Sequence, residues 1–151
     1  MLIKQDNLEN GKVIALLKEH LADMYATSPA ESVHALDVNA LKDPAITFFS
    51  AWENDVLMGC VAIKKLDNKH AELKSMRTPT NMRNKGTGKA LLEHIFAYCR
   101  TFEFERISLE TGSMAFFKPA RSLYEKFGFV YCEPFADYED DPNSRFMTKV
   151  F

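Results

Sequence analysis

The most informative stretch of this sequence is Arg83-Asn84-Lys85-Gly86-Thr87-Gly88-Lys89. It joins a β-type segment to a run of apolar residues at helical spacing, so we expect a loop that opens a helix. Unpaired N–H groups and the helix dipole at a helix N-terminus attract a phosphate, and glycine lets the phosphate approach the backbone. The flanking Arg83, Lys85 and Lys89 add positive charge. The stretch therefore predicts a phosphate-binding loop.

Two glycines two residues apart do not by themselves identify the phosphate, and they are also compatible with a loop that is merely shaped by glycine. A Walker A loop would need glycine in place of Arg83 and Ser or Thr in place of Ala90. A dinucleotide fingerprint would need a third glycine in place of Leu91. Neither of these two nucleotide-binding motifs fits.

Upstream of the loop, the pattern predicts a short strand and then a helix with apolar residues from Val13 to Met24 at spacings of three and four. Ser28-Pro29 ends that helix, and Ser32 to Leu41 is expected to form a second short helix. The run from Ala45 to Thr78 is rich in β-branched and aromatic residues and is broken by two polar turns. It predicts three antiparallel strands.

Downstream of the loop, we expect a helix from about Gly86 to Arg100 and a strand at Ile107–Glu110. A right-handed crossover through that helix makes this strand the parallel neighbour of the strand before the loop. A final helix from Phe116 to Lys126 ends at Gly128, and one or two strands surround the loop at residues 137–144. The order of elements predicts a mixed α+β layout.

The composition bounds the class of protein. A chain of 151 residues suits a single domain over residues 1–151, and its 46% hydrophobic and 26% charged residues are typical of a globular fold. A net charge of −2 gives no basic surface for nucleic acid. The N-terminus has no signal-peptide pattern, and no stretch approaches the roughly 20 apolar residues of a membrane span. We therefore expect a cytoplasmic protein with no nucleic-acid or membrane partner.

The cysteines and histidines give no metal-binding pattern. Cys60, Cys99 and Cys132 lie far apart within apolar stretches, so we assign them to packing in a reduced environment. The four histidines are scattered without ligand spacing, and no metal is expected. Acidic residues concentrate at 137–141, where they form either a solvated loop or a surface that attracts a cationic amine.

Two motifs in this order resemble the GNAT superfamily of N-acetyltransferases. Arg83 to Gly88 matches the family pattern (Q/R)-x-x-G-x-(G/A) without a gap, and Ala120 to Phe129 is similar to its A-x-x-L-Y-x-x-x-G-F segment. Further residues resemble the YsnE-like bacterial branch, which says little about the substrate: Ser108 to Ser113, Pro134-Phe135, Tyr138 and Asp141 to Ser144.

The resemblance implies a fold and a cofactor. The GNAT fold has a central, mostly antiparallel, twisted sheet of six to seven strands that is splayed between strands 4 and 5 and flanked by about four helices. The pantetheine arm of acetyl-CoA would insert into the splay against the backbone of Met76, Arg77 and Thr78. The pyrophosphate would be held by Arg83, Asn84, Lys85, Gly86, Thr87, Gly88 and Lys89. Phe117 stands where relatives often carry an asparagine that contacts the coenzyme arm, which makes that contact apolar here.

The resemblance also implies catalytic residues. Glu72 stands where relatives carry a glutamate base, and Tyr124 matches the general acid near the coenzyme sulfur; a phenol is a proton donor at neutral pH. Each has an alternative: Glu72 as an exposed strand residue paired with Lys74, and Tyr124 as a core side chain. If Glu72 faces the cleft, strand alternation puts Lys74 and Met76 on its side and Leu73 on the other.

Three further residues are expected to bind the substrate. Lys74 would pair with Glu72 or bind a substrate carboxylate. Glu110 and Ser113 end a strand at the cleft mouth, where they would orient the substrate or cap the next helix. We thus expect an N-acetyltransferase that moves the acetyl group of acetyl-CoA to a primary amine of a small molecule or peptide, with a homodimer as a possible form. The alternatives are a non-catalytic acyl-CoA sensor and a plain interaction protein.

Overall fold

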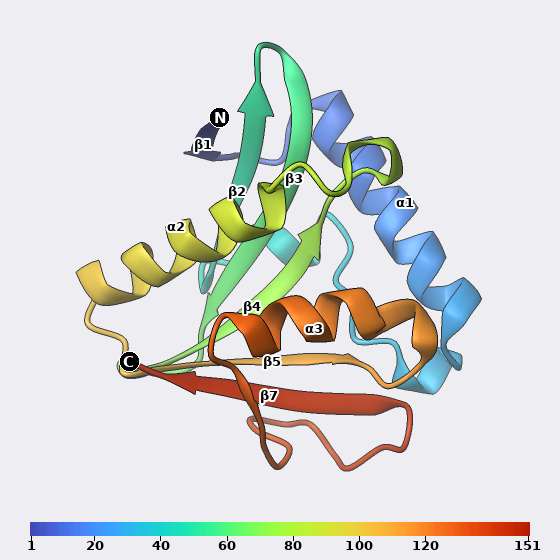
Figure 1. Cartoon of the computed structure of the whole chain (residues 1–151), viewed down its shortest axis with the longest axis vertical. Helices are drawn as coiled ribbons and strands as arrows, with labels where there is room; N and C mark the ends of the chain where they lie inside the picture. The colour runs from blue at the N-terminus through green and yellow to red at the C-terminus, as the bar shows by residue number, and fades with distance from the viewer.

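The computed structural model describes residues 1–151, which form one seven-stranded sheet and three α-helices (Figure 1). The strands are β1 (Leu2–Gln5), β2 (Ile46–Glu53), β3 (Val56–Lys65), β4 (His70–Arg77), β5 (Arg106–Gly112), β6 (Val130–Tyr131) and β7 (Ser144–Val150). The helices are α1 (Gly11–Thr27), α2 (Thr87–Thr101) and α3 (Lys118–Lys126). The predicted α+β class and the three antiparallel strands before the loop are confirmed.

The sheet is antiparallel except at its centre. The strand order is β1-β2-β3-β4-β5-β7-β6, and β4 and β5 are the only parallel neighbours. These two strands are joined through α2, as the crossover rule predicts. The loop and the N-terminus of α2 therefore lie at the C-terminal end of β4, next to β5.

A gap opens between β4 and β5. Their ladder ends at the pair Glu72 and Ser108, although β4 runs on to Arg77. Over the same distance β5 stays paired with β7 as far as Gly112. The facing edges of the two strands are thus unpaired beyond Glu72, which is the predicted splay.

A β-bulge at Ser75 corrects the predicted alternation along β4. Ser75 has a left-handed φ of 53°, and three steps along β4 from Lys74 to Arg77 match two steps along β3. The extra residue reverses the side-chain faces. Met76 therefore packs with Leu73 against the core under α2 and does not lie beside Glu72. Arg77 points to the face of the sheet that α1 covers.

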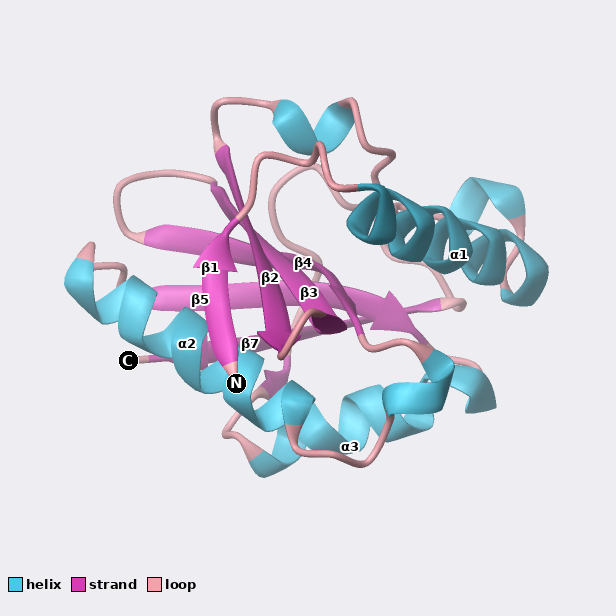
Figure 2. Cartoon of the chain, turned by 90° about the horizontal axis from the view of Figure 1, so that it is seen from above, coloured by secondary structure: helices cyan, strands magenta, loops and turns pink.

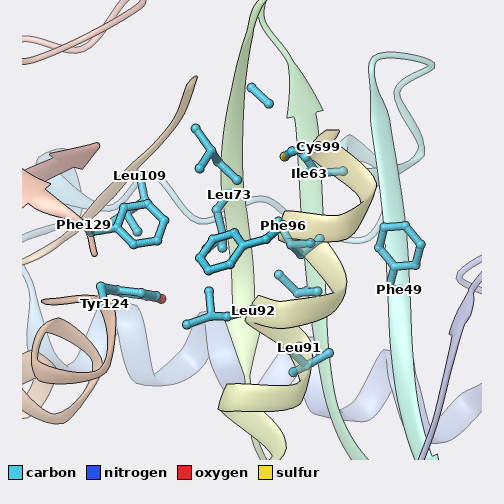
Figure 3. Close-up of a cluster of buried hydrophobic side chains, with 14 of the residues drawn as sticks. Phe49, Ile63, Leu73, Leu91, Leu92, Phe96, Cys99, Leu109, Tyr124 and Phe129 are labelled. Atoms are coloured by element: carbon cyan, nitrogen blue, oxygen red, sulfur yellow. The ribbon is translucent and has the colours of Figure 1, made fainter. Parts of the chain in front are cut away.

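The helices cover opposite faces of the sheet, α1 on one and α2 and α3 on the other (Figure 2). The larger core joins the strands to α2 and α3 and includes Leu91, Leu92 and Phe96 (Figure 3). The smaller core packs Val13, Leu16 and Leu17 of α1 against β2 and β3. The buried Cys99 and Cys60 pack in the larger and smaller core respectively, as expected from the sequence.

The predicted helix at Ser32 to Leu41 is wrong. Short 3-10 turns at Ala30–Ser32 and Ala40–Lys42 stand at the two ends, with no regular element at residues 33–37 and a turn at 38–39 between them. Leu36 and Val38 still pack against the smaller core, so the apolar spacing reflects contacts of a non-helical segment. The structure therefore has three α-helices where about four were expected, and none is long and apolar enough to cross a membrane.

Candidate functional site

A cavity of about 460 Å³ is lined from both faces of the sheet and includes the gap between β4 and β5. We call one part the α2 half; it is formed by Met76 to Thr78, Met82 to Asn84, Gly86 to Lys89, Phe117 and Tyr124. The α1 half is formed by Glu72, Lys74 and Glu110 together with His20, His34 and Tyr138. Most of the predicted site residues line this cavity: Glu72, Lys74, Met76, Arg77, Thr78, Arg83, Asn84, Gly86, Thr87, Gly88, Lys89, Glu110, Phe117 and Tyr124.

The α2 half contains an uncapped helix N-terminus. Gly86 is the N-cap residue of α2, has a φ of +80°, and offers no side chain to cap the helix. The next residues, Thr87, Gly88 and Lys89, begin the helix, so their N–H groups have no partner within it. No atom outside its immediate neighbours lies within 4 Å of the place where a Cβ on Gly86 would stand. The helix end is open to an anion.

Other groups in this half fit a diphosphate. The Thr87 Oγ1 is buried without a hydrogen-bond partner, and Arg83 and Lys89 bring positive charge to the lining. Gly88 has a different role, because a Cβ there would lie 2.8 Å from Leu123 Cδ2 of α3. Gly88 thus allows α2 and α3 to pack closely. Lys85 is exposed and lies outside the lining.

The end of β4 offers backbone to the cavity. The Arg77 side chain is buried and donates from Nη2 to Glu19 Oε1 at 2.7 Å and to Asp23 on α1. The Nη2 group of Arg77 is therefore bound to α1. Arg77 is also paired with Cys60 of β3, so the edge of β4 that faces β5 beyond Glu72 is what remains for a ligand in the gap. Across the gap, the ring of Phe117 fills the space over Gly112, where a Cβ would lie 2.2 Å from the ring. The lining there is apolar.

Tyr124 is the phenol of the α2 half. It is only 6% exposed, packs against Phe129 with ring centroids 5.6 Å apart, and still lines the cavity. Figure 3 shows its hydroxyl pointing away from α3. Burial, with the negative charge of Glu110 as a second cause, raises the pKa of Tyr124 above its ordinary value. The phenol stays protonated at neutral pH and can donate a proton.

Glu72, Lys74 and Tyr138 form a hydrogen-bonded cluster in the α1 half. Lys74 Nζ lies 3.1 Å from Glu72 Oε2 and 2.9 Å from the Tyr138 hydroxyl, which itself donates to Glu72 Oε2. Glu72 is 3% exposed, so this ion pair is largely removed from water. Burial and the charge of Glu72 raise the pKa of Tyr138. The expected pairing of Lys74 with Glu72 is present, but on a buried face rather than an exposed one.

Glu110 lies in the same half without a hydrogen bond to its buried Oε2. Burial raises its pKa to about 7, with Lys74 opposing the shift and Glu72 adding to it. Ser113 does not join the cavity. Its hydroxyl donates to the Pro142 carbonyl at 2.7 Å and so holds the loop before β7.

Sequence reasoning did not place Tyr138 or His34 in the site. Their rings meet edge to face with centroids 5.0 Å apart. Tyr138 carried part of the family resemblance, but no periodic pattern fixes where a side chain in that loop points. Asp141 from the predicted acidic loop accepts a hydrogen bond from the Ser32 hydroxyl at 2.6 Å. The loop is therefore tied to the 3-10 turn after α1, rather than being only a solvated run of charge.

His20 lines the α1 half from α1, and its Nδ1 is buried without a partner. Burial, together with the nearby Arg77 charge, lowers the pKa of His20 to about 4. The ring is therefore neutral near pH 7. No group of three metal-binding side chains gathers anywhere in residues 1–151.

Residues 13–129 match the model of the acetyltransferase (GNAT) family. The chain is 56% identical over 149 residues to the uncharacterized N-acetyltransferase YsnE of Bacillus subtilis, with 99% of each chain covered. It is 48% identical over 146 residues to the uncharacterized N-acetyltransferase YedL of Escherichia coli, with 97% of this chain and 92% of YedL covered.

Solved structures share the fold. A Klebsiella pneumoniae protein described as an acyl-CoA N-acyltransferase superposes with a TM-score of 0.79 at 23% identity, covering 99% of this chain and 96% of its own. A GNAT acetyltransferase of Elizabethkingia anophelis, at 15% identity and a TM-score of 0.71, covering 99% of this chain and 97% of its own, was solved with acetyl-CoA bound. The family match over residues 13–129 and the two relatives at 56% and 48% identity show that the chain belongs to the GNAT family of N-acetyltransferases.

Proposed function

We propose that this enzyme transfers the acetyl group of acetyl-CoA to a primary amine of a small molecule or peptide, by direct attack within a ternary complex. The observation that carries this proposal is the single cavity that joins an open helix N-terminus to a buried cluster of charged side chains. A donor and an acceptor held in one cavity are placed to react directly with each other. Acetyl-CoA supplies the activated acetyl group.

The α2 half is proposed to hold acetyl-CoA. The N–H groups of Thr87 to Lys89 would bind the pyrophosphate, with Asn84, Arg83 and the exposed Lys85 beside it. The backbone of Met76 to Thr78, on the edge of β4 that faces β5, would bond the pantetheine arm, and Phe117 would pack against it. This assignment is supported by the uncapped helix and by the unpaired strand edges in the gap.

Two residues are proposed to handle protons. Tyr124 would donate its phenolic proton to the departing sulfur, and its raised pKa supports the protonated form. Glu72 would supply the negative charge that draws a proton from the amine, either directly or through a relay. Lys74 would hold Glu72 in place through the 3.1 Å contact and would face a carboxylate of the substrate.

Release of free CoA tests the proposal. Purified protein, acetyl-CoA and a panel of amines are combined, and thiol is measured against a blank that lacks the amine. The blank is necessary because Cys132 is only partly buried and is a thiol of the protein itself. At least one amine should release CoA in step with an acetylated product identified by mass spectrometry. Tight CoA binding with no turnover on any amine would instead favour the acyl-CoA sensor.

A further inference from the structure

The α1 half holds two carboxylates whose surroundings differ. Glu72 Oε2 accepts hydrogen bonds from both Lys74 and Tyr138, so two donors already occupy that oxygen. Glu110 Oε2 is buried and accepts no hydrogen bond at all. A buried carboxylate oxygen without a donor is costly, and a ligand N–H would relieve that cost. Of the two residues, Glu110 is the one with a buried carboxylate oxygen that lacks a hydrogen-bond donor.

The two carboxylates also differ in their place along the gap. Glu72 pairs with Ser108 at the point where the β4–β5 ladder ends, so it stands at the closed end of the gap. Glu110 lies two residues further along β5, roughly 7 Å by the strand rise. Its other edge is paired with Phe146 of β7, and its edge toward β4 is free. Glu110 therefore lies within the gap itself.

Tyr124 provides a second marker of position. Besides burial, the charge of Glu110 raises the pKa of Tyr124 and also that of Tyr138, whereas the charge of Glu72 raises the pKa of Tyr138 and of Glu110. Glu110 and Tyr124 also line the same cavity. A proton donor and a proton acceptor for one reaction must both reach the reacting atoms. Of the two carboxylates, Glu110 is the one whose charge acts on Tyr124.

We infer that Glu110 is the catalytic group that takes the proton from the acceptor nitrogen, and that Glu72 acts behind it as the buried counter-ion of Lys74. This inference rests on the proposed acetyl transfer and moves the proton-accepting role from Glu72 to Glu110. Glu72, Lys74 and Tyr138 are then positioning residues that set the charge around Glu110.

The protons of the proposed acetyl transfer balance with Glu110, Tyr124 and the two substrates alone. The Glu110 carboxylate takes one proton from the ammonium form of the acceptor and leaves a neutral amine. The nitrogen lone pair forms the C–N bond as the C–S bond breaks, and Tyr124 gives its phenolic proton to the sulfur. Tyr124 regains a proton from the new amide nitrogen, and Glu110 releases its proton to solvent. One proton is released per turnover, and nothing is oxidised or reduced.

The charges around Glu110 fit this role. Burial raises its pKa to about 7, so the carboxylate gains its charge as the pH rises through neutrality. Activity should therefore rise with pH over the same range. The titratable or charged groups around it come from three elements: Lys74 and Glu72 of β4, Tyr124 of α3, and Tyr138 and Asp141 of the loop before β7.

The pH dependence of kcat separates the two carboxylates. Wild-type kcat should rise with an apparent pKa near 7. Glu110→Gln should lose about 100-fold or more in kcat and lose this dependence, with CoA affinity unchanged. Glu72→Gln should keep the rise with pH at a shifted midpoint. The matched control is Glu105→Gln, an exposed glutamate at the base of β5, which should behave as wild type.

Carbon-13 NMR of labelled glutamate carboxyl groups gives a readout that needs no turnover. One carboxyl should titrate near pH 7 in the wild type and be missing in Glu110→Gln. Glu110→Asp, which keeps a carboxylate, should retain the pH dependence at a lower kcat. A Glu110→Gln enzyme with the wild-type pH profile, or a Glu110 that titrates below pH 5, would overturn the inference. Failure of every amine to react would overturn the proposed function instead, whatever the titration shows.

Discussion

The two halves of the cavity are built from different parts of the chain. The α2 half takes its open N–H groups from one short stretch, Thr87 to Lys89, at the start of a single helix. The α1 half takes side chains from α1, β4, β5 and the loop before β7. Backbone groups recognise any phosphate of the right shape, whereas a cluster of charged side chains is specific to its ligand. Under the proposed assignment, backbone groups would bind the cosubstrate and side chains would select the acceptor.

The largest expected effect is on the α2 half. Gly86→Glu should weaken CoA binding about 1000-fold, or about 4 kcal/mol, as measured by calorimetric titration. The new side chain would strain a φ of +80° and place a carboxylate beside the pyrophosphate, and like charges in contact cost several kcal/mol. Gly86→Ala has the strain without the charge and should weaken binding about tenfold. If Gly86→Glu binds CoA within threefold of wild type, the loop is not part of the cofactor site.

The next effect lies where the halves meet. Tyr124→Phe should lower kcat about 100-fold through loss of the proton donor, while the dissociation constant for CoA stays unchanged. The ring keeps its packing on Phe129, so the fold is retained. Tyr131→Phe, which removes an exposed hydroxyl bonded to Glu125, is the matched control and should stay within twofold of wild type. If kcat is unchanged in Tyr124→Phe, another group is the proton donor.

The same contrast explains how much could be predicted from sequence. The loop at residues 83–89 and the helix after it are local in sequence, so their spacing was enough to predict an anion site at a helix start. The parallel pair β4–β5 followed from the crossover rule. The fold could be predicted because its strands and helices carry regular periods.

The α1 half could not be assembled in this way. Tyr138 meets Glu72 across 66 positions of sequence, and such a contact leaves no local period. The bulge at Ser75 reversed the faces of Met76 and Arg77, because one residue in the left-handed region breaks strict alternation. The segment from 33 to 39 resembled a helix in sequence because its apolar residues recur at helical intervals, although Leu36 and Val38 pack against the core from a non-helical chain.

A smaller effect is expected within the α1 half. Tyr138→Phe should lower kcat/KM for the amine about tenfold, because the buried Glu72 loses one charged hydrogen bond, worth about 1.5 kcal/mol. The contact between Lys74 and Glu72 at 3.1 Å remains, which limits the loss. The KM for acetyl-CoA should not change if the two halves act separately. An equal rise in the KM for acetyl-CoA would show that Tyr138 supports the α2 half too.

The smallest effect is expected at Ser113, where a variant distinguishes a role in holding the loop before β7 from a role in binding the substrate. Sequence reasoning assigned Ser113 to the substrate, but its hydroxyl donates to the Pro142 carbonyl at 2.7 Å and it does not line the cavity. Ser113→Ala should lower the free energy of unfolding by about 1 kcal/mol, measured by denaturant titration, because one neutral hydrogen bond is lost. The kcat/KM for the amine should stay within twofold of wild type. A tenfold fall in kcat/KM at unchanged stability would instead return Ser113 to the acceptor site. It would also mean that Ser113 moves into the cavity when the amine binds, since in the present arrangement its hydroxyl bonds to the Pro142 carbonyl and to Met114 Sδ outside the lining.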